Sequence, residues 1–217
     1  MKPLYVCTQT VDRLDCLAQL VASCEASTRK PDGIFVVDHG YDSLKVLEAT
    51  RTPTIPVTII TLHDPGCSHN GNWYIQHVPD DRVCCGDDVV FEPTALEILA
   101  QTPGDFVIPF PNINPAACCL IRQSCVEKLA EFDRGYDGDF PGLFDELISP
   151  GYLYFDDTDF LRRMELAGIQ QTAGHGPPNL GIQHRSKSLR LVTVDHHPRA
   201  IHGVRHMFFF QHVLRHL

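Results

Sequence analysis

The chain lacks any long run of apolar residues. Its 217 residues contain no stretch that approaches the roughly 18–20 apolar residues needed to cross a membrane. The opening residues, MKPLYVCTQTVDR, also lack the extended apolar run of a secretion signal, and neither an internal repeat nor a low-complexity tract is visible. We therefore expect a protein without a membrane span that acts in the cytoplasm.

A second absence concerns the pairing of cysteines. The nine cysteines include no C-x-x-C pair, which gives a structural zinc site little support. Their odd number, without an export signal, disfavours a disulfide framework. Cys84–Cys85 and Cys118–Cys119 are adjacent pairs inside strand-like runs, where neighbouring side chains point to opposite faces of the strand. We expect reduced thiols that are mostly buried.

Charged residues are also too few for a highly charged, disordered chain, since they make up 21% of the sequence. A hydrophobic fraction of 43% is enough to form a sizeable core, and the length suits one α/β domain. We assign residues 1–190 to this domain. Residues 191–217 form a basic, histidine-rich tail with a helical pattern, which we expect to pack on the domain as a C-terminal helix.

The formal net charge of −9 is unevenly distributed along the chain. From Arg185 onward there are six basic residues and one acidic residue, a net charge of +5 that leaves −14 in the preceding part. Six of the 12 histidines follow Asp195. A basic tail on an acidic body is able to meet an anionic partner at one place. A solvated terminal helix explains the same charges.

Strand and helix patterns alternate over the first two thirds of the chain. Alternation of this kind predicts a mostly parallel sheet covered by helices on both faces, with ligands bound beyond the carboxyl ends of the strands. Residues 63–72 are rich in Gly, Pro, Asn and Ser, so we expect a loop there. The strands are expected at 4–8, 34–37, 57–62 and 82–85, and the helices at 13–27, 41–50 and from Pro93 onward.

Polar residues stand where several of these strands end. Thr8 and Thr10 belong to the polar TQT at the end of the first strand, Asp38 closes the second, and Asp87–Asp88 follows the strand at 82–85. One acid at such a position is often only a helix cap or a turn former. Acids at the ends of different strands favour a binding site.

A second group of acids lies in residues 131–160, which contain nine acidic residues and one basic residue. Asp156, Asp157 and Asp159 open a predicted helix over 160–167, which Gly168 ends. The helix dipole stabilises acids in a first turn, and this explains one or two of them. An adjacent carboxylate pair with a histidine suits Mg²⁺ or Mn²⁺. A separate carboxylate at a helix start is able to accept a proton from a hydroxyl.

The motifs follow one another in a recognisable order. A strand and helix around TQTVDRLDCLAQLVAS precede IFVVDHG, CCGDDVVFEP, NPAACCLIRQSCVEKLAEFD, GLFDE, YFDDTDFLRRMELAG and QHRSKS. Over most of residues 3–190, this order resembles that of the inverting family 2 glycosyltransferases, which have the GT-A fold. The resemblance implies a nucleotide-sugar donor and a Mn²⁺ or Mg²⁺ cofactor.

The resemblance also implies a role for each matching residue. Thr8 and Thr10 line the donor site, and Asp38 contacts the base or ribose of the nucleotide. Asp88 is the principal metal ligand, Asp87 an auxiliary ligand or phosphate-side acid, and His184 the late metal ligand. Asp157 is the general base, with Asp156 as its alternative.

Two departures from the family pattern affect these roles. Gly86 stands where many relatives have an acid, and no Arg-Asn pattern follows Leu62, so no phosphate-binding arginine is assigned there. For some of these residues a purely structural explanation also remains open. His184 is otherwise an ordinary loop histidine, and Trp73 and Tyr74 either stack on the ligand or pack against the sheet.

The sequence therefore predicts a metal-dependent inverting glycosyltransferase, with a UDP-sugar as the default donor. The acceptor is a saccharide, a protein, a small molecule or, if the basic tail binds nucleic acid, a hydroxymethylated base in DNA, as in viral DNA modification. A base in a duplex must be flipped out to reach such a site. A function of another class, a non-catalytic module that binds nucleotide-sugars, fits the same motifs.

Overall fold

The computed structural model describes residues 2–10, 13–39, 43–62, 67–109, 118–136, 156–173 and 182–184. The predicted tail at 191–217 lies outside the described residues, as does the GLFDE segment.

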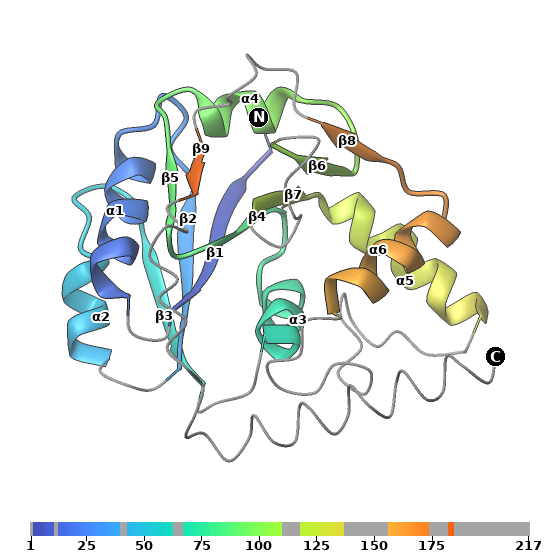
Figure 1. Ribbon diagram of the computed structural model, residues 1–217, viewed down its shortest axis with the longest axis horizontal. Helices are drawn as coiled ribbons and strands as arrows, with labels where there is room; N and C mark the ends of the chain where they lie inside the picture. Colours follow the sequence, from blue (N-terminus) through green and yellow to red (C-terminus); the bar gives the residue numbers. More distant parts are fainter. Residues whose placement is uncertain are drawn as a thin grey trace.

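The described residues form one large sheet and one small one (Figure 1). The large sheet has seven strands in the order β3-β2-β1-β4-β7-β6-β8, and β5 pairs with β9 in the small sheet. The strands are β1 (Leu4–Thr10), β2 (Gly33–Asp38), β3 (Val57–Thr61), β4 (Asp81–Gly86), β5 (Val89–Phe91), β6 (Phe106–Ile108), β7 (Cys118–Ile121), β8 (Gln171–Ala173) and β9 (Ile182–His184).

Most neighbouring strands of the large sheet run in the same direction. β3, β2, β1 and β4 are mutually parallel, and β6 is parallel to β8. β7 is antiparallel to both of its neighbours, β4 and β6. The prediction of a mostly parallel sheet is confirmed.

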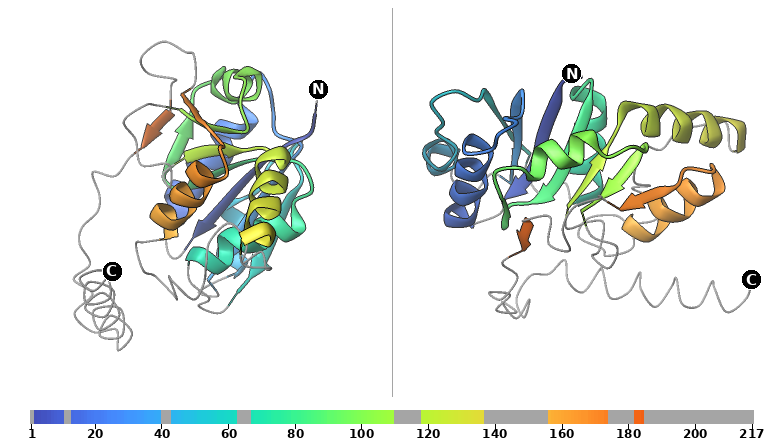
Figure 2. Two further views of the ribbon diagram at one scale, coloured as in Figure 1. Left: turned by 90° about the vertical axis from the view of Figure 1, so that its right-hand side faces the viewer. Right: turned by 90° about the horizontal axis from the view of Figure 1, so that it is seen from above.

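Helices cover both faces of this sheet. They are α1 (Leu14–Glu25), α2 (Ser43–Ala49), α3 (Cys67–His77), α4 (Ala95–Gln101), α5 (Gln123–Tyr136) and α6 (Asp156–Leu166). Buried residues of α1, α2 and α4 form one core cluster with one face of the strands, while α3, α5 and α6 supply residues to two clusters on the other face. α1 and α2 lie at one end of the molecule, and α5 and α6 lie at the other (Figures 1 and 2).

Alternation along the strands sorts the side chains between these two layers. In β1, Leu4 and Val6 join the cluster beneath α1, whereas Cys7 faces α3. The adjacent cysteines behave in the same way, since Cys118 faces the α1 layer and Cys119 the α5 layer. Eight of the nine cysteines have side chains that the structure describes; these eight are free thiols and most are buried, as predicted.

The expected loop at 63–72 is wrong in its second part, because α3 begins at Cys67. Gly and Asn gave this segment a low helical propensity, but tertiary packing overrides propensity. Tyr74, only 5% exposed, and Val78 pack against β1 and β2. Trp73 stacks on His77 with ring centroids 4.2 Å apart, a contact between neighbouring turns.

An arginine fastens the amino end of β4 to its surroundings. Arg122 pairs with Asp81 at 2.6 Å and donates hydrogen bonds to the carbonyl oxygens of Ala100, Thr102 and Gly104. This network holds β4, whose other end carries the acidic motif. Among the described helices, none is both long and apolar enough to span a membrane.

Candidate functional site

Four of the residues predicted to form the site lie together at the carboxyl ends of three adjacent strands. Thr10, the last residue of β1, pairs in register with Asp38, the last residue of β2. On the other side of β1, Gln9 pairs with Gly86, and Asp87 and Asp88 follow directly. The sheet therefore collects these side chains at one edge, although they come from three separate stretches of sequence.

Asp87 and Asp88 form a nearly buried carboxylate pair. Asp87 is 1% exposed and Asp88 5% exposed. Thr10 donates a hydrogen bond from Oγ1 to Oδ2 of Asp87 at 3.0 Å. Arg13, which precedes α1, donates from Nη1 to Oδ2 of Asp88 at 2.9 Å and from Nη2 to Oδ1 of Asp87.

Arg13 was not predicted from the sequence. It is separated by more than 70 residues from the two carboxylates that it contacts, so no local pattern connects them. The only signal was its position just beyond the first strand, at the edge where a parallel sheet binds ligands.

Burial and the Arg13 guanidinium act in opposite directions on the ionisation of this pair. Burial raises the pKa of Asp87 to about 6, although Arg13 and Thr10 act to lower it. Burial lowers the pKa of Arg13, but the carboxylates of Asp87 and Asp88 more than offset this and leave it raised.

Gly86 gives the Asp88 carboxylate its room. A Cβ atom added at Gly86 would lie 2.7 Å from Oδ1 of Asp88 and must displace it. The departure from the family pattern at this position therefore has a local physical reason. With Asp88 in this orientation, any larger residue at 86 collides with the carboxylate.

Asp38 lies on the other side of β1 with its own polar partners. Its side chain is fully buried and accepts hydrogen bonds from Ser43 Oγ at 2.8 Å and Thr61 Oγ1 at 3.5 Å. Thr8, two residues before Thr10, is 1% exposed, and its hydroxyl has no partner within the described part of the chain. Tyr74 donates its hydroxyl to the carbonyl oxygen of Thr8, so packing against the sheet is the correct alternative for this tyrosine.

The remaining predicted residues are placed by their backbone. β9 pairs antiparallel with β5, and His184 is the register partner of Val89, which directly follows Asp88. The backbone of His184 therefore lies beside the acidic motif, although 95 residues separate His184 from Val89 in the sequence. Asp156 and Asp157 are the first two residues of α6, as predicted. The start of α6 lies on the same lower side of Figure 1 as the carboxyl ends of β1 and β2.

The donor set at this edge fits a hard divalent cation. The carboxylates of Asp87 and Asp88 match the oxygen ligands that Mn²⁺ and Mg²⁺ prefer. The nearly buried pair already draws a cationic side chain to itself, which shows that the position favours positive charge. Within the described ranges, no three His, Cys, Asp or Glu side chains are grouped to hold a metal ion.

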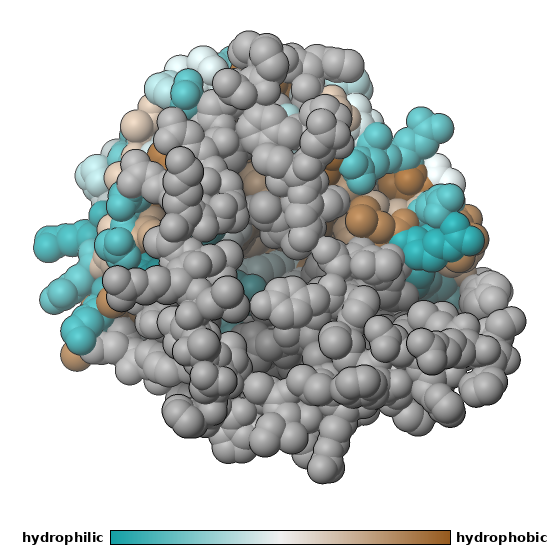
Figure 3. All heavy atoms as spheres, viewed as in Figure 1, coloured by the Kyte–Doolittle hydropathy of each residue, from teal (hydrophilic) through white to brown (hydrophobic). Residues whose placement is uncertain are grey.

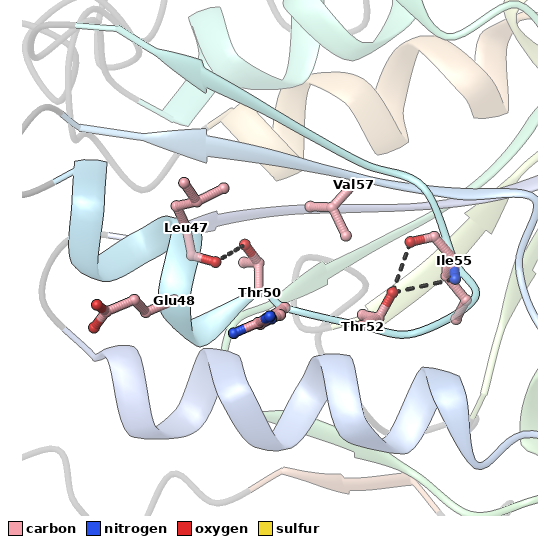
Figure 4. Close-up of a pocket in the computed structure, with 7 residues that line it drawn as sticks. Leu47, Glu48, Thr50, Thr52, Ile55 and Val57 are labelled. Atoms are coloured by element: carbon pink, nitrogen blue, oxygen red, sulfur yellow. Dashed lines mark hydrogen bonds between the residues drawn. The ribbon is translucent and has the colours of Figure 1, made fainter.

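Two surface pockets lined by described residues lie elsewhere. One, of 360 Å³, lies between the end of α2 and the start of β3, where Figure 4 shows Leu47, Thr50 and Ile55 around it. The other, of 550 Å³, lies at the end of α6, on the side where Figure 3 shows exposed apolar side chains; Leu166 is 54% exposed there. Neither pocket contains a predicted site residue.

No family model and no curated protein matches the chain, but solved structures of glycosyltransferases share its fold. One is the mannosyltransferase PcManGT from Pyrobaculum calidifontis in complex with GDP-Man and Mn²⁺. It has a TM-score of 0.60 and 14% identity, and the match covers 86% of this chain and 58% of that one. Another is S. aureus TarS 1–349 in complex with UDP-GlcNAc, with a TM-score of 0.54 and 14% identity, covering 86% of this chain and 61% of that one.

The chain thus spans about three fifths of the length of these two proteins, since 58% and 61% of them are covered. At 14% identity the likeness concerns the fold. The protein has the α/β architecture of these enzymes, a GT-A-like glycosyltransferase fold, as its sequence motifs predict.

Proposed function

We propose that the protein is a metal-dependent, inverting glycosyltransferase that moves a sugar from a nucleotide-sugar to an acceptor hydroxyl. The observation that supports this most strongly is the nearly buried Asp87–Asp88 pair at the carboxyl edge of the sheet. It lies across β1 from Asp38, in a fold shared with PcManGT, which is solved with GDP-Man and Mn²⁺.

The spacing of these acids suits an extended nucleoside diphosphate. Asp38 is the last residue of the strand on one side of β1, and Asp87 follows the strand on the other. Two strand spacings are about 10 Å, so the nucleoside contacts Asp38 and the diphosphate reaches the acidic pair. Thr10 lies between them on β1. Thr8 is enclosed, so we assign it to the wall behind the site.

The metal-binding roles follow from the same arrangement. Asp88 and His184 would hold Mn²⁺ or Mg²⁺, with Asp87 as auxiliary ligand. When bound, such a cation neutralises the charge that develops on the departing diphosphate.

Asp157 supplies the proton acceptor in this proposal. The acceptor hydroxyl gives its proton to the carboxylate while its oxygen attacks the anomeric carbon, and the bond from that carbon to the diphosphate oxygen breaks. Attack from the side opposite the leaving group inverts the configuration. Asp156, the adjacent acid at the start of α6, is the alternative base.

The first experiment incubates the protein with Mn²⁺ and a panel of UDP- and GDP-sugars and measures the nucleoside diphosphate released. UDP-sugars are the default donors. Turnover that EDTA abolishes is the expected result. Binding of nucleotide without turnover of any donor would instead indicate a non-catalytic binding module, and full activity in metal-free buffer would contradict the metal requirement.

Two variants separate binding from chemistry. Asp88→Asn retains size but removes charge, and should strongly weaken Mn²⁺-dependent nucleotide binding in calorimetry. Asp157→Asn should preserve nucleotide affinity and reduce transfer about 10²–10⁴-fold, the usual contribution of a positioned base. Asp156→Asn should reduce the rate of transfer by a smaller factor. If Asp156→Asn is the inactive variant, Asp156 is the base.

A further inference from the structure

Arg13 occupies an unusual position for a helix-capping residue. It is the N-cap of α1, yet it makes no side-chain capping bond to the helix. Its guanidinium instead reaches both carboxylates of the acidic pair. The side chain remains 45% exposed, whereas Asp87 is 1% and Asp88 6% exposed as side chains. One side of the guanidinium therefore contacts the carboxylates and the other faces solvent.

The guanidinium binds the oxygens that a divalent cation requires. Its two terminal nitrogens donate to Oδ1 of Asp87 and Oδ2 of Asp88. A cation bound by Asp88 must share these lone pairs with the guanidinium and tolerate its positive charge at close range. Arg13 therefore competes with a metal ion for these oxygens.

A diphosphate removes this conflict. It brings negative charge to the same edge, and the planar fork of arginine matches phosphate oxygens in a bidentate way. The exposed side of Arg13 gives the side chain a route to such a ligand without disturbing the buried pair.

We propose that Arg13 is a counter-ion of the Asp87–Asp88 pair before ligands bind and transfers to the donor diphosphate when metal and nucleotide bind. The inference rests on the proposed function. It assigns a positioning residue that makes metal and nucleotide bind cooperatively. The metal alone is repelled by the guanidinium, and the diphosphate alone is repelled by the two carboxylates. When both bind, each positive charge has a negative partner. Linkage requires this coupling to be the same whichever ligand binds first.

The test measures the two affinities separately. Binding of Mn²⁺ alone is followed by electron paramagnetic resonance of the free ion, and binding of UDP or GDP with saturating Mn²⁺ by calorimetry. Arg13→Gln should bind Mn²⁺ alone about tenfold more tightly, because a competing positive charge is gone. The same variant should bind the nucleotide about tenfold more weakly, because a charged phosphate contact is lost.

Changes of opposite sign distinguish this role from a structural one. If Arg13 merely supports the carboxylates, Arg13→Gln weakens both affinities, and this result or two unchanged affinities overturns the inference. Arg13→Lys, which keeps the charge and loses the fork, should leave Mn²⁺ binding weak and reduce nucleotide affinity. It provides the same test if the glutamine variant does not fold. Arg51→Gln, an exposed arginine beyond α2, is the matched control and should change neither affinity.

The failure of this inference differs from that of the proposed function. If the wild-type protein binds neither Mn²⁺ nor a nucleotide, both the proposed function and the role of Arg13 are wrong. A wild-type protein that binds both ligands, with Arg13→Gln shifting both affinities in one direction, removes only the role of Arg13.

Discussion

A single methyl group at Gly86 is expected to disturb the metal-ligand position. The Cβ atom of Gly86→Ala would lie 2.7 Å from Oδ1 of Asp88, so the carboxylate must turn away from its present contact with Arg13. We expect Mn²⁺ binding, measured by calorimetry in the presence of UDP or GDP, to weaken about 10–100-fold, as when the support of a metal ligand is lost.

A glycine in the same sheet provides the control for this change. In Gly33→Ala the added Cβ atom would contact only the ring of Tyr5, at 3.3 Å, and the backbone of Pro56. Its Mn²⁺ affinity should equal that of the wild type even if stability falls slightly. Equal affinities in Gly86→Ala and Gly33→Ala would argue against Asp88 as a metal ligand.

His39 should make stability depend on pH in one direction. It is 5% exposed, and burial lowers its pKa although Asp38 acts to raise it. Above about pH 6.5 the imidazole is neutral in both the folded and the unfolded state. As the pH falls below this value, the unfolded chain takes up the proton first, so stability is lost progressively toward the folded-state pKa.

Urea unfolding of the wild type and His39→Gln between pH 8 and pH 5 measures this effect. The difference between the two proteins should be constant above pH 7. Below pH 6.5 the wild type should lose up to about 1.4 kcal/mol per pH unit more than the variant. Parallel curves over the whole range would show that His39 is protonated equally in both states.

The placement of residues at strand ends was predictable, and the placement of residues through distant contacts was not. Asp38 ends β2 and Asp87 directly follows β4, and parallel strands must bring such positions to one edge. Arg13 stands equally close to a strand, but its partners lie in another βα unit. Only the folded sheet, with β1 beside β4, brings them together.

At the scale of elements, β4 is anchored through one arginine. Arg122 is 19% and Asp81 4% exposed as side chains, and Arg122 also donates to three carbonyl oxygens in the last turn of α4 and the segment after it. Arg122→Ala leaves a buried carboxylate without its cation and three carbonyl groups without this donor. We expect a loss of about 3 kcal/mol in the free energy of unfolding, measured with urea.

An exposed ion pair provides the matched comparison. Arg162 and Glu165 are 61% and 70% exposed as side chains and lie three residues apart on α6. Arg162→Ala should change the free energy of unfolding by less than about 1 kcal/mol, because water screens the pair. If both variants lose the same stability, the carbonyl network around Arg122 contributes nothing beyond an ordinary surface contact.

Long, periodic elements were predictable from the sequence, and those defined by tertiary contacts were not. α1 shows a regular apolar spacing, and its observed bounds agree with the prediction to within two residues. α3 was missed because the aromatic contacts of Trp73 and Tyr74 stabilise it. The short strands β6 and β8 carry three residues each, too few to show a period.

For the whole molecule, the order of motifs was more informative than sequence identity. Matching structures share only about 14% of residues with the chain, yet the sequence of strand ends, acidic pair and acidic helix start predicted their fold. A fold of this kind requires polar residues only at a few strand ends, while the core accepts many apolar substitutions. The fold does not specify the acceptor of the proposed reaction.

The uneven charge of the molecule gives a test of the DNA alternative. The preceding part of the chain carries −14 and repels phosphates, so an anionic acceptor must be held by the +5 segment that starts at Arg185. The whole of that segment, including the tail at 191–217, lies outside the described residues, and the prediction rests on its sequence. We expect a labelled duplex containing hydroxymethylcytosine to bind in a salt-dependent way, measured by fluorescence anisotropy. Replacing Arg199, Arg205 and Arg215 with Gln should weaken this binding.

Salt dependence separates a phosphate contact from a change in net charge. If all three arginines contact phosphates, the slope of log K against log salt should fall by about 2.7 in the triple variant. The control replaces three exposed basic residues of the body, Lys45, Arg51 and Arg162, with Gln, which gives the same change in net charge. That control should retain the wild-type slope. An unchanged slope in the tail variant removes the support for nucleic acid, and a saccharide then becomes the acceptor to test first.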